Sequence, residues 1–266
     1  MLGAIIGDIV GSVYEVNNIK SKEFEFFTGK MSFTDDSILA MATADWLLHG
    51  GQVDKYYAQY ATAYPHPMGS YGGSFLQWID RAQRGVFEPY GSCGNGSAMR
   101  VGAVGWAFDT LEETLDAARQ SAECTHDHPE GVKGAQATAM CIFMARKGYT
   151  KKEIKREVEA RFGYDLNMTC DQLRAHYGWQ SKWGNGGICQ ASVPQAIVCF
   201  LEGLDFEDCV RNAISIGGDS DTIGCITGSI AEAFHGIPQE MRERAIGYLD
   251  PSLKAMLQEF ETRFGC

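Results

Sequence analysis

Apolar residues recur at helical spacing along most of this 266-residue chain, and glycine or proline marks where successive helical segments end or begin. In the segment from Asp36 to His49, Ile38 and Trp46 belong to an apolar stripe that stops at a pair of glycines. The segment from Phe75 to Arg84 repeats the pattern. The segment from Pro129 to Lys147 is apolar on nearly every side, which is typical of a helix at the centre of a fold.

Other kinds of structure are expected in only a few places. The stretches Glu23 to Phe27 and Lys30 to Ser32 favour a short hairpin or an extended loop. The region from Asp165 to Cys189, which contains Trp179 and Trp183, is the least regular and is interpreted as an insertion or as a lid over a pocket. We find no repeat and no linker-like tract, so we predict one domain over residues 1–266. The predicted fold class is all-α, a compact orthogonal multi-helix bundle.

Composition and charge exclude several classes of protein. Hydrophobic residues make up 45% and charged residues 21% of the chain, as in ordinary soluble globular proteins. No stretch is apolar enough to span a bilayer, and the N-terminal run from Met1 to Asp8 is expected to be a core helix and not a signal peptide. A net charge of -11 disfavours binding to a nucleic-acid backbone. Nine cysteines without a Cys-x-x-Cys pair indicate reduced thiols and a cytoplasmic location.

Two acidic clusters lie at opposite ends of the chain. The first is Thr34-Asp35-Asp36 and the second is Asp219-Ser220-Asp221-Thr222, which follows two glycines. Helix capping accounts for one acid in each cluster, but less well for two. Carboxylate and hydroxyl oxygens are the ligands that Mg²⁺, Mn²⁺ and Ca²⁺ prefer. If the fold brings the clusters together, they form a two-metal site.

The N-terminal segment offers two further acids. Gly7 and Gly11 are four residues apart, a spacing that permits close helix contact. Asp8 and Glu15 are seven apart, and we expect them on one face of a helix. From the residues alone, a helix-packing face with an exposed Glu15 is the favoured interpretation, and a buried Asp8 needs a partner.

Two turns complete the candidate site. The stretch from Ser92 to Arg100 is a glycine-rich turn that runs into a helix, an arrangement that exposes amides to an anion such as phosphate. It lacks the Gly-Lys-Ser/Thr ending of a Walker A loop. Phe87, upstream, is an aromatic residue that either stacks on a base or belongs to the core. The stretch from Cys124 to His128 is too closely spaced for a structural zinc site and favours a turn in which His126 faces a pocket.

Taken together and in order, these segments resemble the ADP-ribosylglycohydrolase family, which includes dinitrogenase reductase-activating glycohydrolases and ADP-ribosylhydrolase-like proteins. The matching pieces extend from about residue 3 to residue 236, and they are Gly7-Asp8 with Gly11 and Glu15, Thr34-Asp35-Asp36-Ser37, Gly94-Asn95-Gly96-Ser97-Ala98-Met99-Arg100, Thr125-His126, and Gly217-Gly218-Asp219-Ser220-Asp221-Thr222. The resemblance implies an all-α fold with a binuclear metal cleft, two divalent cations (Mg²⁺ or Mn²⁺), and release of ADP-ribose from an ADP-ribosylated substrate.

The resemblance also implies roles for individual residues. The implied metal ligands are Thr34, Asp35, Asp36, Asp219, Asp221 and Thr222, with Asp221 a candidate bridge. The implied substrate-binding residues are Phe87, Ser92, Cys93, Gly94, Asn95, Gly96, Ser97 and His126. Glu15 is the first candidate for proton transfer, and Asp36 is the second because metal ligation can occupy it.

Two alternatives share the same residues. A two-metal nucleotide phosphatase or pyrophosphatase needs the same oxygen-rich centre, but its water attacks phosphorus. A catalytically silent family member that binds ADP-ribose keeps the fold without the reaction. The acceptor to which ADP-ribose is attached, the choice between Mg²⁺ and Mn²⁺, and the oligomeric state are not encoded in any motif of the sequence.

Overall fold

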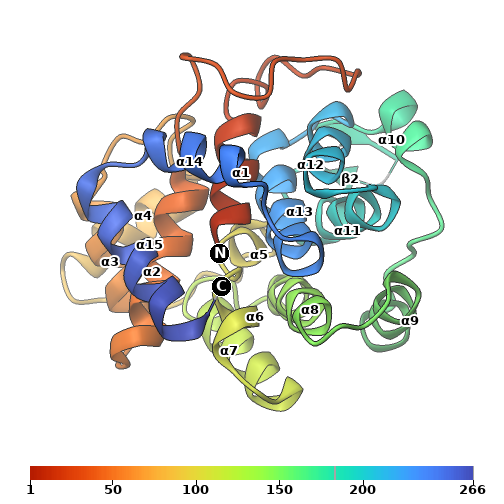
Figure 1. Cartoon of the computed structure of the whole chain (residues 1–266). Helices are drawn as coiled ribbons and strands as arrows, with labels where there is room; N and C mark the ends of the chain where they lie inside the picture. Colours follow the sequence, from red (N-terminus) through yellow and green to blue (C-terminus); the bar gives the residue numbers. More distant parts are fainter. Residues whose placement is uncertain (183, 266) are drawn as a thin grey trace.

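The computed structural model describes residues 1–182 and 184–265, which form an almost entirely helical fold (Figure 1). In chain order the helices are α1 (Leu2–Gly11), α2 (Asp35–His49), α3 (Val53–Ala63), α4 (Gly73–Ala82), α5 (Gly96–Met99), α6 (Val104–Ala107), α7 (Leu111–Glu123), α8 (Pro129–Arg146), α9 (Lys151–Phe162), α10 (Cys170–His176), the 3₁₀ helix η1 (Cys189–Ala191), α11 (Val193–Glu202), α12 (Phe206–Ser215), α13 (Ser220–His235), α14 (Gln239–Tyr248) and α15 (Pro251–Phe264). The two short strands β1 (Gln180–Ser181) and β2 (Gly184–Asn185) form an antiparallel hairpin. The all-α prediction is therefore confirmed.

The centre of the fold is the contact between α1 and α13, which lie side by side in the middle of Figure 1. Their backbones meet through glycines. A Cβ atom built at Gly7 would lie 1.9 Å from the carbonyl oxygen of Gly224, and one at Gly3 would lie 2.2 Å from that of Gly228. Only glycine permits this approach. The four-residue glycine spacing thus serves the close helix contact that it predicted, and it brings the beginning and the last third of the chain together.

Helix α8 packs against α7, α13 and α5, and most of its side chains are buried. This confirms the expectation of a central helix from its apolar composition. Helix α2 begins where the sequence indicated, with Thr34 as the N-cap and its side-chain oxygen accepting a hydrogen bond from the amide of Asp36. The two acidic clusters therefore open helices α2 and α13.

Of the two alternatives expected at 23–27 and 30–32, the structure shows the loop and not the hairpin, because no strand is found there and the segment crosses one end of the bundle. Its anchors are aromatic and cationic side chains. Phe26 and Phe27 are buried, and the Arg211 guanidinium lies 4.8 Å from the ring centroid of Phe24 while donating to the carbonyl oxygens of Lys22 and Phe24. Alternating aromatic residues here mark tertiary packing and not a strand ladder.

The irregular region from Asp165 to Cys189 contains α10 and the β1–β2 hairpin. Trp179 and Gly187, from this region, line the cleft that gathers the acidic clusters, and its interpretation as an insertion or a lid stays a prediction. Trp183 lies outside the described residues. Within the described part of the chain, no helix combines the length and apolarity needed to cross a membrane.

Candidate metal centre and cleft

A cleft of about 360 Å³ opens where the beginnings of α2 and α13 face the turn that precedes α5. Segments distant in sequence supply its walls. They are Glu15, Asp35, Asp36, Leu39, Gly69 to Phe75, Tyr90, Ser92, Gly94 to Gly96, Met99, Arg100, His126, Trp179, Gly187, Asp219, Asp221 and Thr222. The cleft thus gathers both acidic clusters and the glycine-rich turn.

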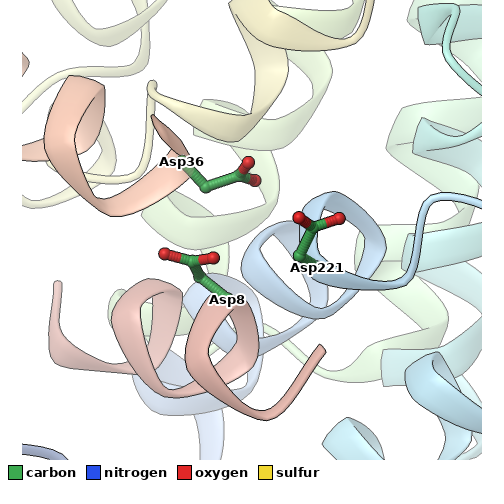
Figure 2. Close-up of side chains that lie close together, drawn as sticks. All are labelled: Asp8, Asp36 and Asp221. Atoms are coloured by element: carbon green, nitrogen blue, oxygen red, sulfur yellow. The ribbon is translucent and has the colours of Figure 1, made fainter. Parts of the chain in front are cut away.

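Three carboxylates from three helices converge at its base: Asp8 from α1, Asp36 from α2 and Asp221 from α13 (Figure 2). One oxygen of each lies within 4.8 Å of the others, and all three side chains are buried. Asp36 Oδ1 is buried and has no hydrogen-bond partner among the described residues. A buried carboxylate oxygen without a donor is costly, and a cation supplies the missing contact.

The sequence analysis favoured helix packing for this segment and required a partner for a buried Asp8, and the structure shows that partner. Its carboxylate accepts hydrogen bonds from the amides and the hydroxyls of both Thr34 and Ser37, with 2.7 Å between Thr34 Oγ1 and Asp8 Oδ1. Burial raises the pKa of Asp8 to about 6, although these hydrogen bonds oppose the rise. Asp8 therefore fixes the start of α2 and also faces the carboxylates. The available signal was an acid within a helix that is otherwise wholly apolar.

A second group consists of Glu15, Asp219 and Asp221, again with one oxygen of each within 4.8 Å of the others. Asp221 belongs to both groups, as a bridging ligand must. Asp219 accepts a hydrogen bond of 2.7 Å from Asn95 Nδ2, which ties the glycine-rich turn to the acidic centre. The expectation that Asp8 and Glu15 share a helical face was wrong, because α1 ends at Gly11 and Glu15 lies in the turn that follows.

The position of Glu15 is set by two contacts beyond its own turn. Trp179 Nε1 donates to the backbone oxygen of Glu15 over 3.1 Å, and a Cβ atom at Gly69 would lie 3.0 Å from Glu15 Oε2. The side chain is half-buried, and its pKa is raised to about 7 by burial and by the nearby charges of Asp219 and Asp8. A carboxyl group with that pKa gains and loses a proton near neutral pH.

Burial first, and mutual repulsion second, raises the pKa values of Asp35, Asp36 and Asp221 well above their ordinary range. The pKa of Asp219 is also raised by burial. Thr222 donates to Asp36 Oδ2 over 3.3 Å, while the Thr34 hydroxyl is bonded to Asp8 and Asp36. The candidate ligand atoms that face the centre are all hard oxygens of carboxylates and hydroxyls. This set fits Mg²⁺ or Mn²⁺, whereas structural zinc sites use cysteine and histidine.

The glycine-rich turn forms the part of the cleft wall next to Asp219. Ser92, Gly94, Asn95 and Gly96 line the cleft, and the turn is held by the Gly94 amide, which donates to Ser92 Oγ, and by the Asn95 amide, which donates to the Gly187 carbonyl oxygen. Ser97 instead points away from the cleft and donates to the carbonyl oxygen of Gly131 over 2.7 Å. Ser97 therefore anchors the turn to the start of α8, while the residues before it line the cleft.

Some residues proposed from the sequence do not line the cleft, and others were missed. Cys93 faces η1, where its carbonyl oxygen accepts from the amide of Cys189. Phe87 is a partly buried aromatic that packs against the core, edge-on to Trp78 with 6.1 Å between ring centroids. The segment from Gly69 to Phe75, which runs into the first turn of α4, was missed; in the structure Ser70 adopts a positive φ of 68°, which costs a non-glycine residue energy. His126 lines the cleft as expected.

Comparison with known proteins places these features in one family. A family model described as ADP-ribosylglycohydrolase matches residues 1–263. The ADP-ribosylhydrolase ARH3 of Homo sapiens is 27% identical over 327 residues, covering 96% of this chain and 90% of the human protein. The ARH3 of Xenopus tropicalis is 27% identical over 317 residues, covering 94% and 91%. A solved structure described as an ADP-ribosylglycohydrolase-related protein complex has a TM-score of 0.70 at 24% identity, covering 98% of this chain and 96% of its own, and this likeness supports the fold.

Proposed function

Because the chain belongs to the ADP-ribosylglycohydrolase family, we propose that it hydrolyses the glycosidic bond between ADP-ribose and an acceptor and releases ADP-ribose. The acceptor is a protein side chain, a nucleobase or a small molecule, and the bond is N- or O-glycosidic. The observation that carries this proposal is the pair of carboxylate groups that share Asp221 at the base of the cleft. We treat residues 1–266 as one catalytic domain.

Two divalent cations, Mg²⁺ or Mn²⁺, are the cofactors of the proposed reaction. The residues that would hold them are Asp8, Thr34, Asp35, Asp36, Asp219, Asp221 and Thr222. The unpartnered Asp36 Oδ1 and the raised pKa values of the surrounding carboxyl groups support this assignment, since both indicate carboxylates that lack a counter-charge. When bound, the cations orient ribose hydroxyls and lower the pKa of a water molecule.

Glu15 is the residue that we propose for proton transfer. It faces the acidic centre, is half-buried, and has a pKa raised to about 7 by burial and by the charges of Asp219 and Asp8. A group with a pKa near the working pH accepts a proton from water or donates one to the leaving group. Glycosidic bonds break through an oxocarbenium-like transition state, which the neighbouring carboxylates stabilise electrostatically. Asp36 is less suited because it lies among the metal-binding oxygens.

The glycine-rich turn is proposed to hold the diphosphate. The turn and His126 line the same cleft as the carboxylates, so an anionic ligand would meet hydrogen-bond donors there in a protein whose net charge is -11. We propose a cytoplasmic location for the same enzyme. Its eight described cysteines are unpaired, and even the close pair Cys170 and Cys199 is separated by 4.0 Å between sulfur atoms, which suits a reducing compartment.

The test is a hydrolysis panel in which purified protein meets ADP-ribose linked to arginine, serine and nucleobases, with EDTA and metal add-back arms. Metal-dependent release of free ADP-ribose, resolved by mass, is the expected result and names the acceptor. Release of AMP instead would identify the nucleotide pyrophosphatase alternative. Binding of ADP-ribose without turnover on any linkage would identify a silent binder.

Variants sharpen the panel. The double substitution Asp219→Ala with Asp221→Ala is expected to abolish turnover and metal binding while the helical circular-dichroism spectrum is kept. The matched control is Asp80→Asn, because Asp80 is an exposed acid that pairs with Arg84 on the surface of α4. An active double variant that binds no metal would refute the mechanism.

A further inference from the structure

Arg100 is a buried cation in the wall of the cleft, and its role is not explained by charge pairing. The side chain is 0% exposed and follows the last residue of α5. Its guanidinium lies over the ring of Tyr57, 3.9 Å from the ring centroid, and the structure shows no partner for Nε or Nη1 among the described residues. Of the guanidinium nitrogens only Nη2 is hydrogen-bonded, and it donates to the Ser121 carbonyl oxygen, to Thr125 Oγ1 and, over 3.7 Å, to the sulfur of Cys124.

The contact to Thr125 continues to His126. Thr125 is fully buried, Arg100 Nη2 lies 2.7 Å from its Oγ1, and the same oxygen lies 2.8 Å from His126 Nδ1. Arginine can only donate, so Thr125 Oγ1 must accept at this contact. The threonine hydroxyl has one hydrogen of its own, which therefore needs an acceptor elsewhere.

His126 Nδ1 is that acceptor. The other side chain that the structure pairs with the Thr125 hydroxyl is Cys124, whose sulfur is a weak acceptor and already accepts from Arg100 Nη2. The Arg100 cation, one hydroxyl away, also favours a lone pair at Nδ1 over an N–H hydrogen. Burial, and then the charge of Arg100, lowers the pKa of His126 well below its ordinary value, so the ring is neutral.

The other ring nitrogen faces the cleft. A Cβ atom at Gly96 would lie 3.0 Å from His126 Nε2, and one at Gly94 would lie 3.4 Å from it. None of the described residues forms a hydrogen bond with Nε2, although His126 is only 6% exposed. In a neutral ring whose Nδ1 accepts, the hydrogen resides on Nε2.

We propose that Arg100 and Thr125 are positioning residues that hold His126 as the neutral tautomer with hydrogen on Nε2, offered to a ligand oxygen beside the glycine-rich turn. The identification of that oxygen as one from the ADP-ribose diphosphate rests on the proposed function. The assignment of the tautomer does not depend on the proposed function, because it follows from hydrogen bonds within the protein. A nitrogen that carries this hydrogen cannot act as a base toward water, so His126 binds the ligand and Glu15 moves the proton.

The direct test is a long-range ¹H–¹⁵N correlation spectrum of the histidine side chains at pH 7, with His126 assigned by its loss in His126→Gln. The expected spectrum shows an unprotonated Nδ1 and a protonated Nε2. Thr125→Val removes the hydroxyl at nearly constant size, so the two nitrogen shifts should move toward each other. Thr125→Ser keeps the hydroxyl and should restore the wild-type shifts. A wild-type spectrum with hydrogen on Nδ1, or shifts unchanged in Thr125→Val, would overturn the proposal.

Binding of ADP-ribose to the metal-loaded protein gives the second measurement. Thr125→Val should raise Kd about fivefold, as expected for loss of one hydrogen bond, whereas Thr125→Ser should match the wild type. Equal Kd values for wild type and Thr125→Val would refute the role in binding. If the wild type fails to bind ADP-ribose at all, the proposed function is wrong, and the spectrum still decides the tautomer. The wild-type spectrum also decides it if Thr125→Val does not fold.

Discussion

Replacing Gly7 by alanine should damage the metal centre without touching a ligand. The new Cβ atom would lie 1.9 Å from the Gly224 carbonyl oxygen, where ordinary contact begins at 3.4 Å, so α1 and α13 must part by about 1.5 Å. The three nearest atoms, the carbonyl oxygen and carbon of Gly224 and the amide nitrogen of Cys225, are all backbone, so no side chain can rotate away. Overpacking of this kind costs about 1–3 kcal/mol. The gain from removing a helical glycine, roughly 0.4–1 kcal/mol, offsets only part of it.

The same displacement separates Asp8 on α1 from Asp221 on α13. Their oxygens now lie within 4.8 Å. Ligands of Mg²⁺ sit about 2.1 Å from the ion, so two of them can be at most about 4.2 Å apart. A further separation of about 1.5 Å takes the pair out of range, and misplacement by about 1 Å is enough to lower turnover about 100-fold. We therefore expect Gly7→Ala to lose both stability and metal response.

Urea unfolding in EDTA measures the first effect, and the rise in melting temperature on adding Mn²⁺ measures the second. The matched control is Gly247→Ala in α14, where a Cβ atom meets nothing within 4 Å. That variant should be as stable as the wild type or more stable by about 0.4–1 kcal/mol, with a full metal response. A Gly7→Ala protein that unfolds at the wild-type urea concentration and responds normally to Mn²⁺ would show that the helix contact does not position the ligands.

Three further predictions concern the acidic centre and Trp179. The pKa values of Asp8 and Glu15 are raised to about 6 and about 7 in the folded protein, so the folded state holds more protons than the unfolded chain, whose pKa values are about 3.9 and 4.3. The free energy of unfolding of the metal-free protein should therefore fall as pH rises from 5 to 7.5. If the slope of this free energy against pH were the same with and without Mn²⁺, the result would contradict the assignment of the fall to these carboxyl groups. Asp36→Asn removes a buried charge and should make the metal-free protein more stable at pH 7.5 than the wild type. At a Mn²⁺ concentration of 100 times the wild-type Kd, bound metal should raise the free energy of unfolding of the wild type by about 2.7 kcal/mol, and the Asp36→Asn variant should lack this rise. Urea unfolding with and without Mn²⁺ measures both. Trp179→Phe removes the donor to the Glu15 backbone oxygen and should lower kcat about fivefold with ADP-ribose affinity unchanged. An unchanged kcat would show that Trp179 does not position Glu15, and an equal loss in affinity would assign Trp179 to ligand binding.

Local signals in the sequence were sufficient for the elements and for part of the site. Thr34 caps α2 as its position before two acids indicates, and the apolar composition of α8 places it in the core. The glycine spacing of α1 anticipated a close helix contact. The acids of the two clusters were identifiable because oxygen ligands grouped at helix starts exceed what capping requires. These features depend on neighbours a few residues apart, and a linear pattern records such neighbours directly.

Only the tertiary structure decided which segments meet. Asp8 joins Asp36 and Asp221 because α1 packs on α13 and against the start of α2, and no pattern within α1 specifies those partners. Glu15 reaches the centre from a turn and not from the helix face that its spacing suggested. Phe87 packs against the core instead of the cleft, and Arg100 lies beside Thr125, which is distant along the chain. Contacts of this kind depend on how close two backbones come, and the fold as a whole sets that distance.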